Sequence, residues 1–165
     1  MPKRQIIERA KQDRRQGKSA STQAGEFVKE EMHHVREGKH GARSPKQAIA
    51  IGLSKARRAG VRLRPPKEGT TSKRTVRNAQ RNLAAGAHPH STSGTRSRAV
   101  TGALKREGRG SASKGALARQ ARSAASKRGA SARSAAARKA VTTKGAAGRS
   151  GAAKKAARTR AKHRG

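Results

Sequence analysis

Large apolar side chains are scarce in this chain and are concentrated near its N-terminus. Val, Ile, Leu, Met and Phe number 18 among the 165 residues, and 12 of these 18 lie in positions 1–63. The other apolar residues are Ala, which removes little surface from water when it is buried. Because so little burial does not offset the entropy of ordering a whole chain, we expect a small N-terminal core and a remainder that does not fold alone.

The clearest local signals lie in GKHGARSPKQAIAIGLSKARRAG, residues 38–60. Ser44, followed by Pro45 and then by Gln47, matches a capping box with Pro at the first helical position. Gly60 stands where a left-handed C-terminal cap belongs. The stretch therefore predicts a glycine-containing turn followed by a helix with defined ends.

Two apolar stripes at helical spacing predict a helix-turn-helix hairpin. One stripe lies in EFVKEEMHHVREG, residues 26–38, and the other lies in the helix that follows Ser44. Small residues spaced four apart in the second helix form a groove that lets another helix approach closely, either the first helix or a second copy of the chain. The predicted helix-packing residues are Phe27, Val28, Met32 and Val35 in the first helix and Ala48, Ile49, Gly52, Leu53 and Ala56 in the second.

Outside the hairpin, the patterns predict short basic helices at residues 3–16, 72–86 and 95–108. Residues 111–165 are low-complexity, with 19 Ala, 16 basic residues and no acid. We expect this tail to be disordered in the free protein and partly helical on a phosphate backbone, with hinges at Gly115, Gly129, Gly145, Gly148 and Gly151.

The predicted fold is therefore mostly α: a small N-terminal helical hairpin with a largely disordered or transiently helical Ala/Lys/Arg-rich C-terminal tail. The predicted segments are a basic N-terminal helix and linker at 1–19, the hairpin at 20–64, a basic linker with short helices at 65–110, and the repeat-bearing tail at 111–165.

The charge balance is strongly positive, because 43 Lys and Arg residues face 8 Asp and Glu residues. Residues 1–68 carry 18 basic and 7 acidic residues, whereas residues 69–165 carry 25 basic residues and only Glu107 as an acid. Such self-repulsion favours a polyanionic partner, of which nucleic acid is the commonest. Phe27 is the only aromatic residue and belongs to the predicted core, so duplex DNA is favoured over single strands that need stacking side chains.

The candidate phosphate-binding residues are the cations outside the predicted apolar faces. They are Lys39, Arg43, Lys46, Lys55, Arg57, Arg58, Lys73, Arg74, Arg77, Arg81, Arg122, Lys127, Arg128, Arg133, Arg138, Lys139, Lys144, Arg149, Lys154, Lys155, Arg158 and Arg160. The turn with Lys39, His40 and Arg43 can hold a phosphate at the helix start or can be a plain turn between helices. Base readout by Lys46 and Gln47 fits less well, because this turn is longer than that of a DNA-reading helix-turn-helix.

Metal binding and catalysis find little support in the sequence. Glu-x-x-His occurs twice, at Glu30/His33 and Glu31/His34, but a di-metal bundle takes such pairs from separate helices. The chain has no Cys, no P-loop spacing and no apparent catalytic triad. We expect no enzyme activity, no metal and no cofactor.

The sequence offers no membrane or export signal. Its longest apolar run, residues 48–53, is far below the roughly 20 residues that span a bilayer. The basic N-terminus lacks the apolar region of a secretory signal. We expect the protein in the cytoplasm, at the nucleoid.

Two resemblances follow from these motifs. Residues 26–60 resemble an uncharacterised family of small bacterial and phage-associated proteins with a KQAIAIGLSxARRAG helix. The resemblance is carried by the stretch FVKEEMHHVREGKHGARSPKQAIAIGLSKARRAG. This resemblance implies a helical module and supplies no activity. The acid-free tail is similar in composition to bacterial histone H1-like proteins, which implies coating or compaction of DNA.

These observations lead to one expected function and two alternatives. We expect a nucleoid-associated protein that binds duplex DNA without sequence specificity through phosphate neutralisation, with no membrane association. The alternatives are an RNA- or ribosome-associated protein and a protein-interaction module with an incidental basic tail. Self-association through the hairpin face of Ala48, Gly52 and Ala56 is a further expectation.

Overall fold

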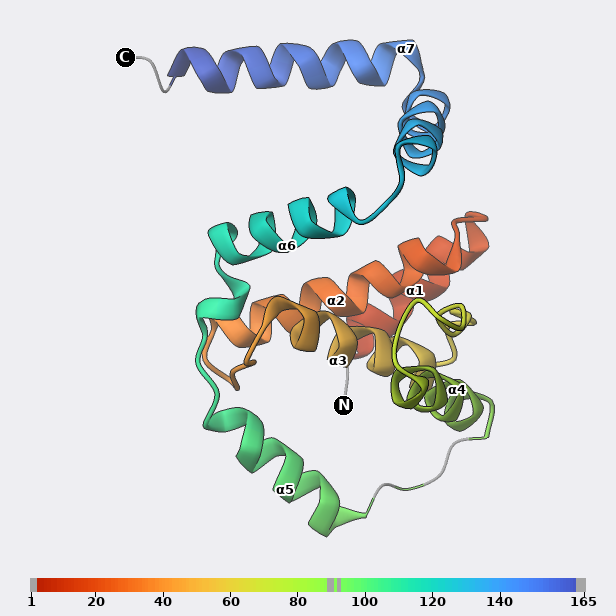
Figure 1. Ribbon diagram of the computed structural model, residues 1–165, viewed down its shortest axis with the longest axis vertical. Helices are drawn as coiled ribbons and strands as arrows, with labels where there is room; N and C mark the ends of the chain where they lie inside the picture. Colours follow the sequence, from red (N-terminus) through yellow and green to blue (C-terminus); the bar gives the residue numbers. More distant parts are fainter. Residues whose placement is uncertain (1–2, 89–90, 92, 163–165) are drawn as a thin grey trace. The chain divides into compact units, whose positions relative to one another are not determined.

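The computed structural model describes residues 3–88, 91 and 93–162, and almost all regular structure in these ranges is α-helical (Figure 1). The described elements are α1 (Arg4–Arg15), α2 (Ala20–Arg36), α3 (Pro45–Arg58), α4 (Lys73–Ala87), α5 (Gly94–Lys105), the 3-10 turn η1 (Gly110–Ala112), α6 (Lys114–Ser126) and α7 (Ala130–Lys162). The chain divides into two compact units, residues 1–120 and 121–165, with the division inside α6. No helix in the described ranges is both long enough and apolar enough to cross a membrane.

Local capping signals define α3 as the sequence predicts. The Ser44 hydroxyl accepts a hydrogen bond from the Gln47 N–H at 3.3 Å. The Gln47 side chain reaches back to the N–H of Arg43 at 2.8 Å, one residue before the position of an ordinary capping box. At the other end Gly60 has φ of 89°, and the N–H of Val61 bonds to the Ala56 carbonyl at 3.1 Å, so that the helix closes in a Schellman motif.

Helix α2 begins earlier than the sequence pattern predicts. The apolar stripe in the sequence begins at residue 26, but the helix starts at Ala20. Ser19 is its N-cap and accepts a hydrogen bond from the Thr22 N–H at 3.4 Å. The added turns bring Ala24 into the core and lengthen the surface that α2 presents to α1 and α3.

Helices α2 and α3 pack directly against each other, which confirms the predicted pairing of their apolar stripes. Gly52 faces Val28 so closely that a Cβ at position 52 would lie 2.7 Å from the Val28 Cα. Ala48 and Ala56, one turn to either side of Gly52, are fully buried. Because α2 covers this small-residue face, it is not available for self-association with a second copy.

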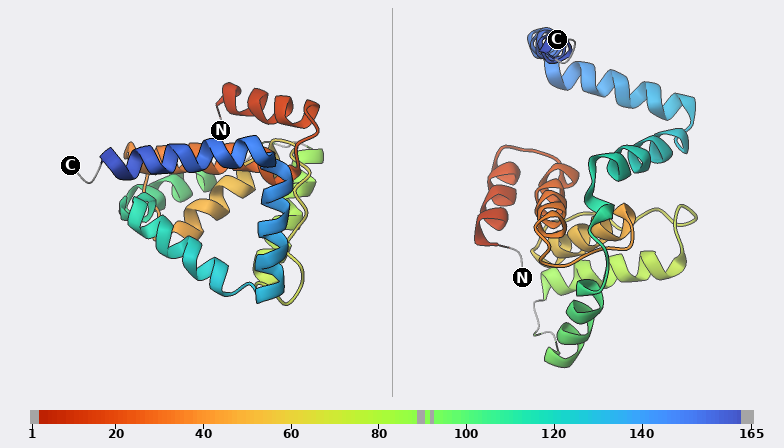
Figure 2. Two further views of the ribbon diagram at one scale, coloured as in Figure 1. Left: turned by 90° about the horizontal axis from the view of Figure 1, so that it is seen from above. Right: turned by 90° about the vertical axis from the view of Figure 1, so that its left-hand side faces the viewer.

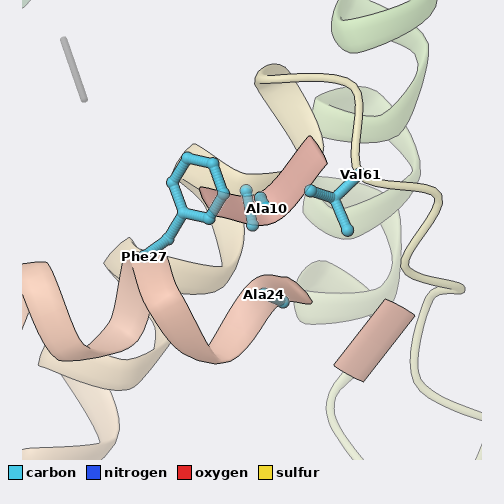
Figure 3. Close-up of a cluster of buried hydrophobic side chains, with 5 residues drawn as sticks. Ala10, Ala24, Phe27 and Val61 are labelled. Carbon is cyan, nitrogen blue, oxygen red and sulfur yellow. The ribbon is translucent and has the colours of Figure 1, made fainter. Parts of the chain in front are cut away.

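One core cluster joins α1, α2 and α3. Ala10, Ala24, Phe27, Ala56 and Val61 form its buried part, and Phe27 is its only large, fully buried side chain. In Figure 3 the Phe27 ring, the Ala10 methyl group and the Val61 side chain extend into the same space between the helices. Helix α1, in which Ala10 is the only buried residue among those described, is thereby held against α2.

A second cluster shows that the first residues of the predicted tail belong to the folded body. Ala112 is fully buried with Met32 and Val35 of α2, and Leu117 of α6 packs against the same cluster. The Arg36 Nε donates a hydrogen bond to the Ala112 carbonyl at 2.9 Å. The segment around η1 therefore covers the end of the α2–α3 pair.

The turn between α2 and α3 is also covered by this later segment. The Gly41 N–H bonds to the Leu104 carbonyl at 2.8 Å, and the Ala42 N–H bonds to the Gly108 carbonyl at 3.1 Å. Gly41 must lack a side chain, because a Cβ there would collide with the Glu107 carbonyl. The small isolated hairpin that we expected is thus wrong: α2 and α3 form the centre of a multi-helix unit that also contains α1, α4 and η1.

The expectation of a largely disordered tail is also wrong. Residues 114–126 and 130–162 are helical, although nearly all of their described side chains are exposed. The expectation was based on the lack of core-forming residues, but an α-helix satisfies its backbone hydrogen bonds locally and Ala is the best helix former. Exposed Ala-rich segments can therefore be helical without a core.

Helix α7 changes direction at one of the predicted hinges (Figure 2). Gly145 has φ of 64° and ψ of 178°, a conformation that L-residues with a Cβ rarely adopt. Gly129 lies between α6 and α7, whereas Gly115, Gly148 and Gly151 lie within helices. The glycines therefore interrupt the tail at two of the five predicted positions.

The close contact at Gly52 can be tested by substitution. We expect Gly52→Ala to lower the free energy of unfolding by about 1–2 kcal/mol, because the strain of overpacking exceeds the gain in helix propensity. Gly25→Ala is the matched control: Gly25 lies in α2 with nothing within 4 Å of an added Cβ, and the change should stabilise by about 0.5–1 kcal/mol. Denaturant unfolding measures both, and equal effects would contradict the close approach.

The kink at Gly145 can be tested by a distance measurement. Because the chain has no Cys, spin labels at Ser134→Cys and Ala157→Cys would be the only labelled sites. We expect Gly145→Ala to lengthen the distance between the labels to the roughly 34 Å of a continuous 23-residue rise. Gly151→Ala, within the helix, should leave the distance of the natural chain unchanged, and an unchanged distance in Gly145→Ala would show that this glycine does not cause the kink.

Candidate nucleic-acid interface and buried charged cluster

Most acidic residues of the N-terminal part form ion pairs with Lys or Arg within the protein. Residues 1–37 contain six of the eight acids and nine of the 43 basic residues. Five of the six acids have a Lys or Arg partner within 4 Å: Glu8–Lys11, Asp13–Lys18, Glu26–Arg9, Glu37–Lys39 and Glu31–Lys55. Glu30 lies 3.8 Å from His34 and accepts a hydrogen bond from the Lys3 N–H at 3.0 Å. The positive charge beyond residue 37 therefore has little acid left to balance it.

Helix α4 concentrates four of the predicted phosphate-binding residues on its exposed side. Lys73, Arg77 and Arg81 follow one another at intervals of four residues, and Arg74 lies next to the first of them. All four side chains are exposed, whereas Val76 and Ala79, on the other side, are buried against the rest of the unit. We call Lys73, Arg74, Arg77 and Arg81 the α4 stripe.

The spacing of the α4 stripe suits a phosphate backbone. Four helical residues rise about 6 Å along the axis, and each DNA strand carries one phosphate per about 3.4 Å of duplex axis. Successive cations of the stripe are thus separated by roughly two phosphate intervals. Helix α4 contains no acidic residue that would compete for them.

The second unit, residues 121–165, carries 14 Lys and Arg residues and no acid. The cations of α7 lie on several sides of the helix rather than along one face, and the described side chains of the unit are exposed apart from the half-buried Ala124. Predicted phosphate-binding residues that are exposed here are Arg122, Lys127, Arg128, Arg133, Arg138, Lys139, Arg149, Lys154, Lys155, Arg158 and Arg160. The side chain of Lys144 lies outside the described part of the structure.

The turn between α2 and α3 offers side chains but few free backbone amides. Arg43 and Lys46 are exposed, while Lys39 pairs with Glu37 at 2.6 Å. The N–H groups of residues 39, 41 and 42 all bond to protein carbonyls. A phosphate at this turn would therefore find few free backbone amides, and most of its contacts would come from side chains.

Three cations of α3 differ sharply in their environments. Arg57 is 6% exposed, and its guanidinium donates hydrogen bonds to the Leu63 carbonyl at 3.1 Å and the Arg64 carbonyl at 3.3 Å. Burial lowers the pKa of Arg57 from its usual value. Lys55 binds the carboxylate of Glu31, whereas Arg58 is exposed beside Asn82. We therefore exclude Arg57 and Lys55 from the candidate phosphate-binding surface and retain Arg58.

A second feature of the same unit is a buried cluster of Glu31, His34 and His40. Glu31 is fully buried, and each side chain offers a ligand atom that lies within 4.8 Å of those of the other two. The rings of His34 and His40 meet edge to face with centroids 6.1 Å apart. From the sequence, a metal site here had little support, because both Glu-x-x-His pairs lie in one helix and a di-metal bundle takes such pairs from separate helices.

Two signals explain how the cluster forms. Glu31 and His34 are three residues apart on α2 and so share one face of the helix. The turn then reverses the chain and returns His40 to the same place, where its Nε2 lies 3.1 Å from Oε1 of Glu31. The cluster could have been predicted from the histidine in the turn, once α3 was predicted to pack on α2.

His34 is held in its neutral form at neutral pH. Burial lowers the pKa of this residue from its usual value, and the positive charge of Lys55 lowers it further, against the opposing effect of Glu30. Because the ordinary pKa of His is about 6.5, a lowered value leaves the ring uncharged at pH 7. A neutral imidazole has a free nitrogen lone pair.

Comparison with known proteins finds a similarity in one part of the chain. Residues 7–68 match the model of a family of unknown function, DUF6496. No curated protein and no solved structure matches the chain. The match supports the resemblance to an uncharacterised family and extends it in both directions beyond residues 26–60, but nothing supports the expected association with phage or the likeness to histone H1-like proteins.

The DUF6496 match covers α1, α2, α3 and the turn that carries His40. The buried cluster of Glu31, His34 and His40 therefore lies inside it. The α4 stripe and residues 121–165 lie outside it. The family match and the largest excess of positive charge thus fall in different parts of the chain.

The contrast between Arg57 and Arg58 gives a testable prediction. We expect Arg57→Gln to lower the free energy of unfolding by about 1–3 kcal/mol, because it removes a buried guanidinium that donates to the Leu63 and Arg64 carbonyls. Arg58→Gln removes the same charge from the next residue and should cost less than about 1 kcal/mol. Denaturant unfolding compares them, and equal losses would contradict the buried role of Arg57.

Proposed function

We propose that this protein binds duplex DNA without sequence specificity, through contacts between its exposed cations and the phosphate backbone. The observation that carries the proposal is the separation of charge. Five of the six acids of residues 1–37 pair with Lys or Arg within the fold, whereas the α4 stripe and residues 121–165 expose cations with no acidic neighbour in the same helix.

Electrostatics supports a polyanionic partner. A phosphate backbone releases condensed counterions when cations replace them, which favours binding without any readout of the bases. Helix α7 exposes cations on several sides, an arrangement suited to contact with a charged polymer rather than with one shaped pocket. Residues of this kind supply affinity and not sequence specificity.

Duplex DNA is preferred in this proposal over single-stranded nucleic acid. Proteins that bind single strands stack exposed bases on aromatic side chains. Phe27 is the only aromatic residue of Phe, Tyr or Trp type, and it is fully buried in the first core cluster. RNA binding, the main alternative, is separated from DNA binding by the experiments below.

A nucleoid role follows from the presence of two cationic parts in one chain. The α4 stripe belongs to the first unit and 14 cations belong to the second. Two separate binding parts let one molecule contact two duplex segments, which raises the effective concentration of the second contact and compacts the DNA. We propose this bridging for the bacterial chromosome.

The α4 stripe is tested by the salt dependence of binding. Replacing Lys73, Arg74, Arg77 and Arg81 together by Gln removes four cations, and we expect the slope of log K against log salt for a DNA duplex to become less negative by roughly 3–4, since each phosphate contact contributes about 0.9. The matched control replaces four exposed cations of α1, Arg4, Lys11, Arg14 and Arg15, by Gln.

The control loses the same net charge from the segment in which acids and bases nearly balance. We expect its slope to change by less than about 1. Equal changes in the two variants would contradict a binding surface on α4. Competition at fixed salt among DNA duplex, RNA duplex and single strands completes the experiment, and a preference for RNA would overturn the DNA assignment.

A further inference from the structure

Glu31 is a fully buried carboxylate whose two oxygens have different partners. Its Oε2 accepts a hydrogen bond from the Lys55 Nζ at 2.5 Å. Its Oε1 accepts no hydrogen bond from any described residue, although the Nε2 of His40 lies only 3.1 Å away. A buried carboxylate oxygen without a donor is costly unless a positive charge lies close to it.

The hydrogen bond of His40 indicates which ring nitrogen carries the hydrogen and which one lies toward Glu31. Its Nδ1 lies 3.0 Å from the carbonyl oxygen of Gly41. Because a carbonyl can only accept, Nδ1 carries the hydrogen in this contact. In the neutral ring Nε2 then has a lone pair, and this lone pair and a carboxylate oxygen face each other at 3.1 Å. Two such acceptors repel unless a cation lies between them.

His34 supplies a third donor to the same place. Its ligand atom lies within 4.8 Å of those of Glu31 and His40, and its side chain is 13% exposed. The three donors are two imidazole nitrogens and one carboxylate oxygen. Such a set is the one that proteins use for Zn²⁺ when three side chains bind the ion and the fourth position is left open.

We propose that Glu31, His34 and His40 form a binding site for a divalent transition-metal ion, with Zn²⁺ as the ion that fits best. Imidazole and carboxylate ligands in a small set favour Zn²⁺ over the oxygen-only cations Ca²⁺ and Mg²⁺. The site lies in the family-matched part of the chain and is independent of the proposed binding of DNA.

The surrounding contacts resemble those that orient metal ligands. The bond from His40 Nδ1 to the Gly41 carbonyl directs Nε2 toward the site, as in many histidine ligands. Lys55 holds the second oxygen of Glu31 and so directs the first toward the site. Its positive charge also opposes a cation, so removal of this charge should strengthen metal binding.

A small movement of His34 completes the geometry. Tetrahedral Zn²⁺ with bonds of about 2.1 Å places its ligand atoms about 3.4 Å apart. The 3.1 Å between His40 and Glu31 is already close to this value, and His34 needs to approach by at most about 1.4 Å. A half-open pocket of about 260 Å³ between α1 and α2, lined in part by Lys3, Ile6 and His33, lies beside the His34 ring.

The expected consequence is a stabilised link between α2 and the turn that leads to α3. A metal bound in the folded state and absent from the unfolded state adds its binding free energy to folding. This chain has a small core and no Cys for disulfides, so such a link would stabilise the part of the fold on which the remaining helices pack.

The direct test is titration of the full-length chain with Zn²⁺ at pH 7 in the absence of nucleic acid. We expect one Zn²⁺ per chain by calorimetry, a rise in the thermal unfolding midpoint with Zn²⁺, and a tetrahedral absorption spectrum when Co²⁺ is used as the probe. His34→Gln and His40→Gln should each weaken Zn²⁺ binding about 100-fold. His33→Gln, a matched change at the exposed neighbour of His34, should alter it less than about twofold.

A second variant keeps the test decisive if a histidine variant unfolds. Lys55→Gln removes the cation that neutralises Glu31, so we expect a less stable chain whose unfolding midpoint is restored by Zn²⁺ and whose Zn²⁺ affinity is about tenfold higher than that of the natural chain.

Several outcomes would overturn the proposal. Absence of stoichiometric Zn²⁺ binding by the natural chain would show that Glu31, His34 and His40 do not form a metal site. Binding that survives in His40→Gln, or that is lost in His33→Gln, would place the ion elsewhere. Failure of Zn²⁺ to stabilise Lys55→Gln would have the same consequence.

Discussion

The close packing of α2 on α3 is the contact on which the rest of the first unit depends. Gly52 lets the backbone of α2 approach at Val28, and the small residues on either side of it extend the contact along both helices. Because this chain has few large apolar side chains, its dispersion contacts and buried surface come from the close approach of the helices rather than from the size of the side chains. Helix α1 then packs on α2, α4 packs on α3, and η1 contacts both central helices.

The same packing decides how charge is distributed. Bringing α2 against α3 buries Glu31 beside Lys55 and His40, and it turns Arg57 inward to bond two carbonyls. The acids of the N-terminal part are thereby satisfied within the fold, and the positive charge of α4 and of residues 121–165 remains exposed. The proposed DNA-binding surface and the proposed metal site are both consequences of this division, although neither depends on the other.

Features with a local cause could be predicted well. The cap at Ser44, the stop at Gly60 and the pairing of the two apolar stripes each depend on neighbours within one or two helices. The tail was predicted wrongly, because its lack of a core was treated as a lack of structure. Helix formation in α6 and α7 uses local backbone bonds and high Ala content, which do not require a core. The covering of the α2–α3 turn by residues 104–112 could not be predicted, since it joins segments more than 60 residues apart.

The sequence by itself determined the two ends of α3, which stripes are apolar and how large the net charge is, because these properties follow from residue type and spacing along one chain. Only the tertiary structure decided which of two neighbours is buried, as for Arg57 against Arg58 and for His34 against His33. The reason is that helical periodicity defines a face but not what that face meets. The cluster of Glu31, His34 and His40 exists only because a turn returns one histidine to a helix that already carries the other two side chains.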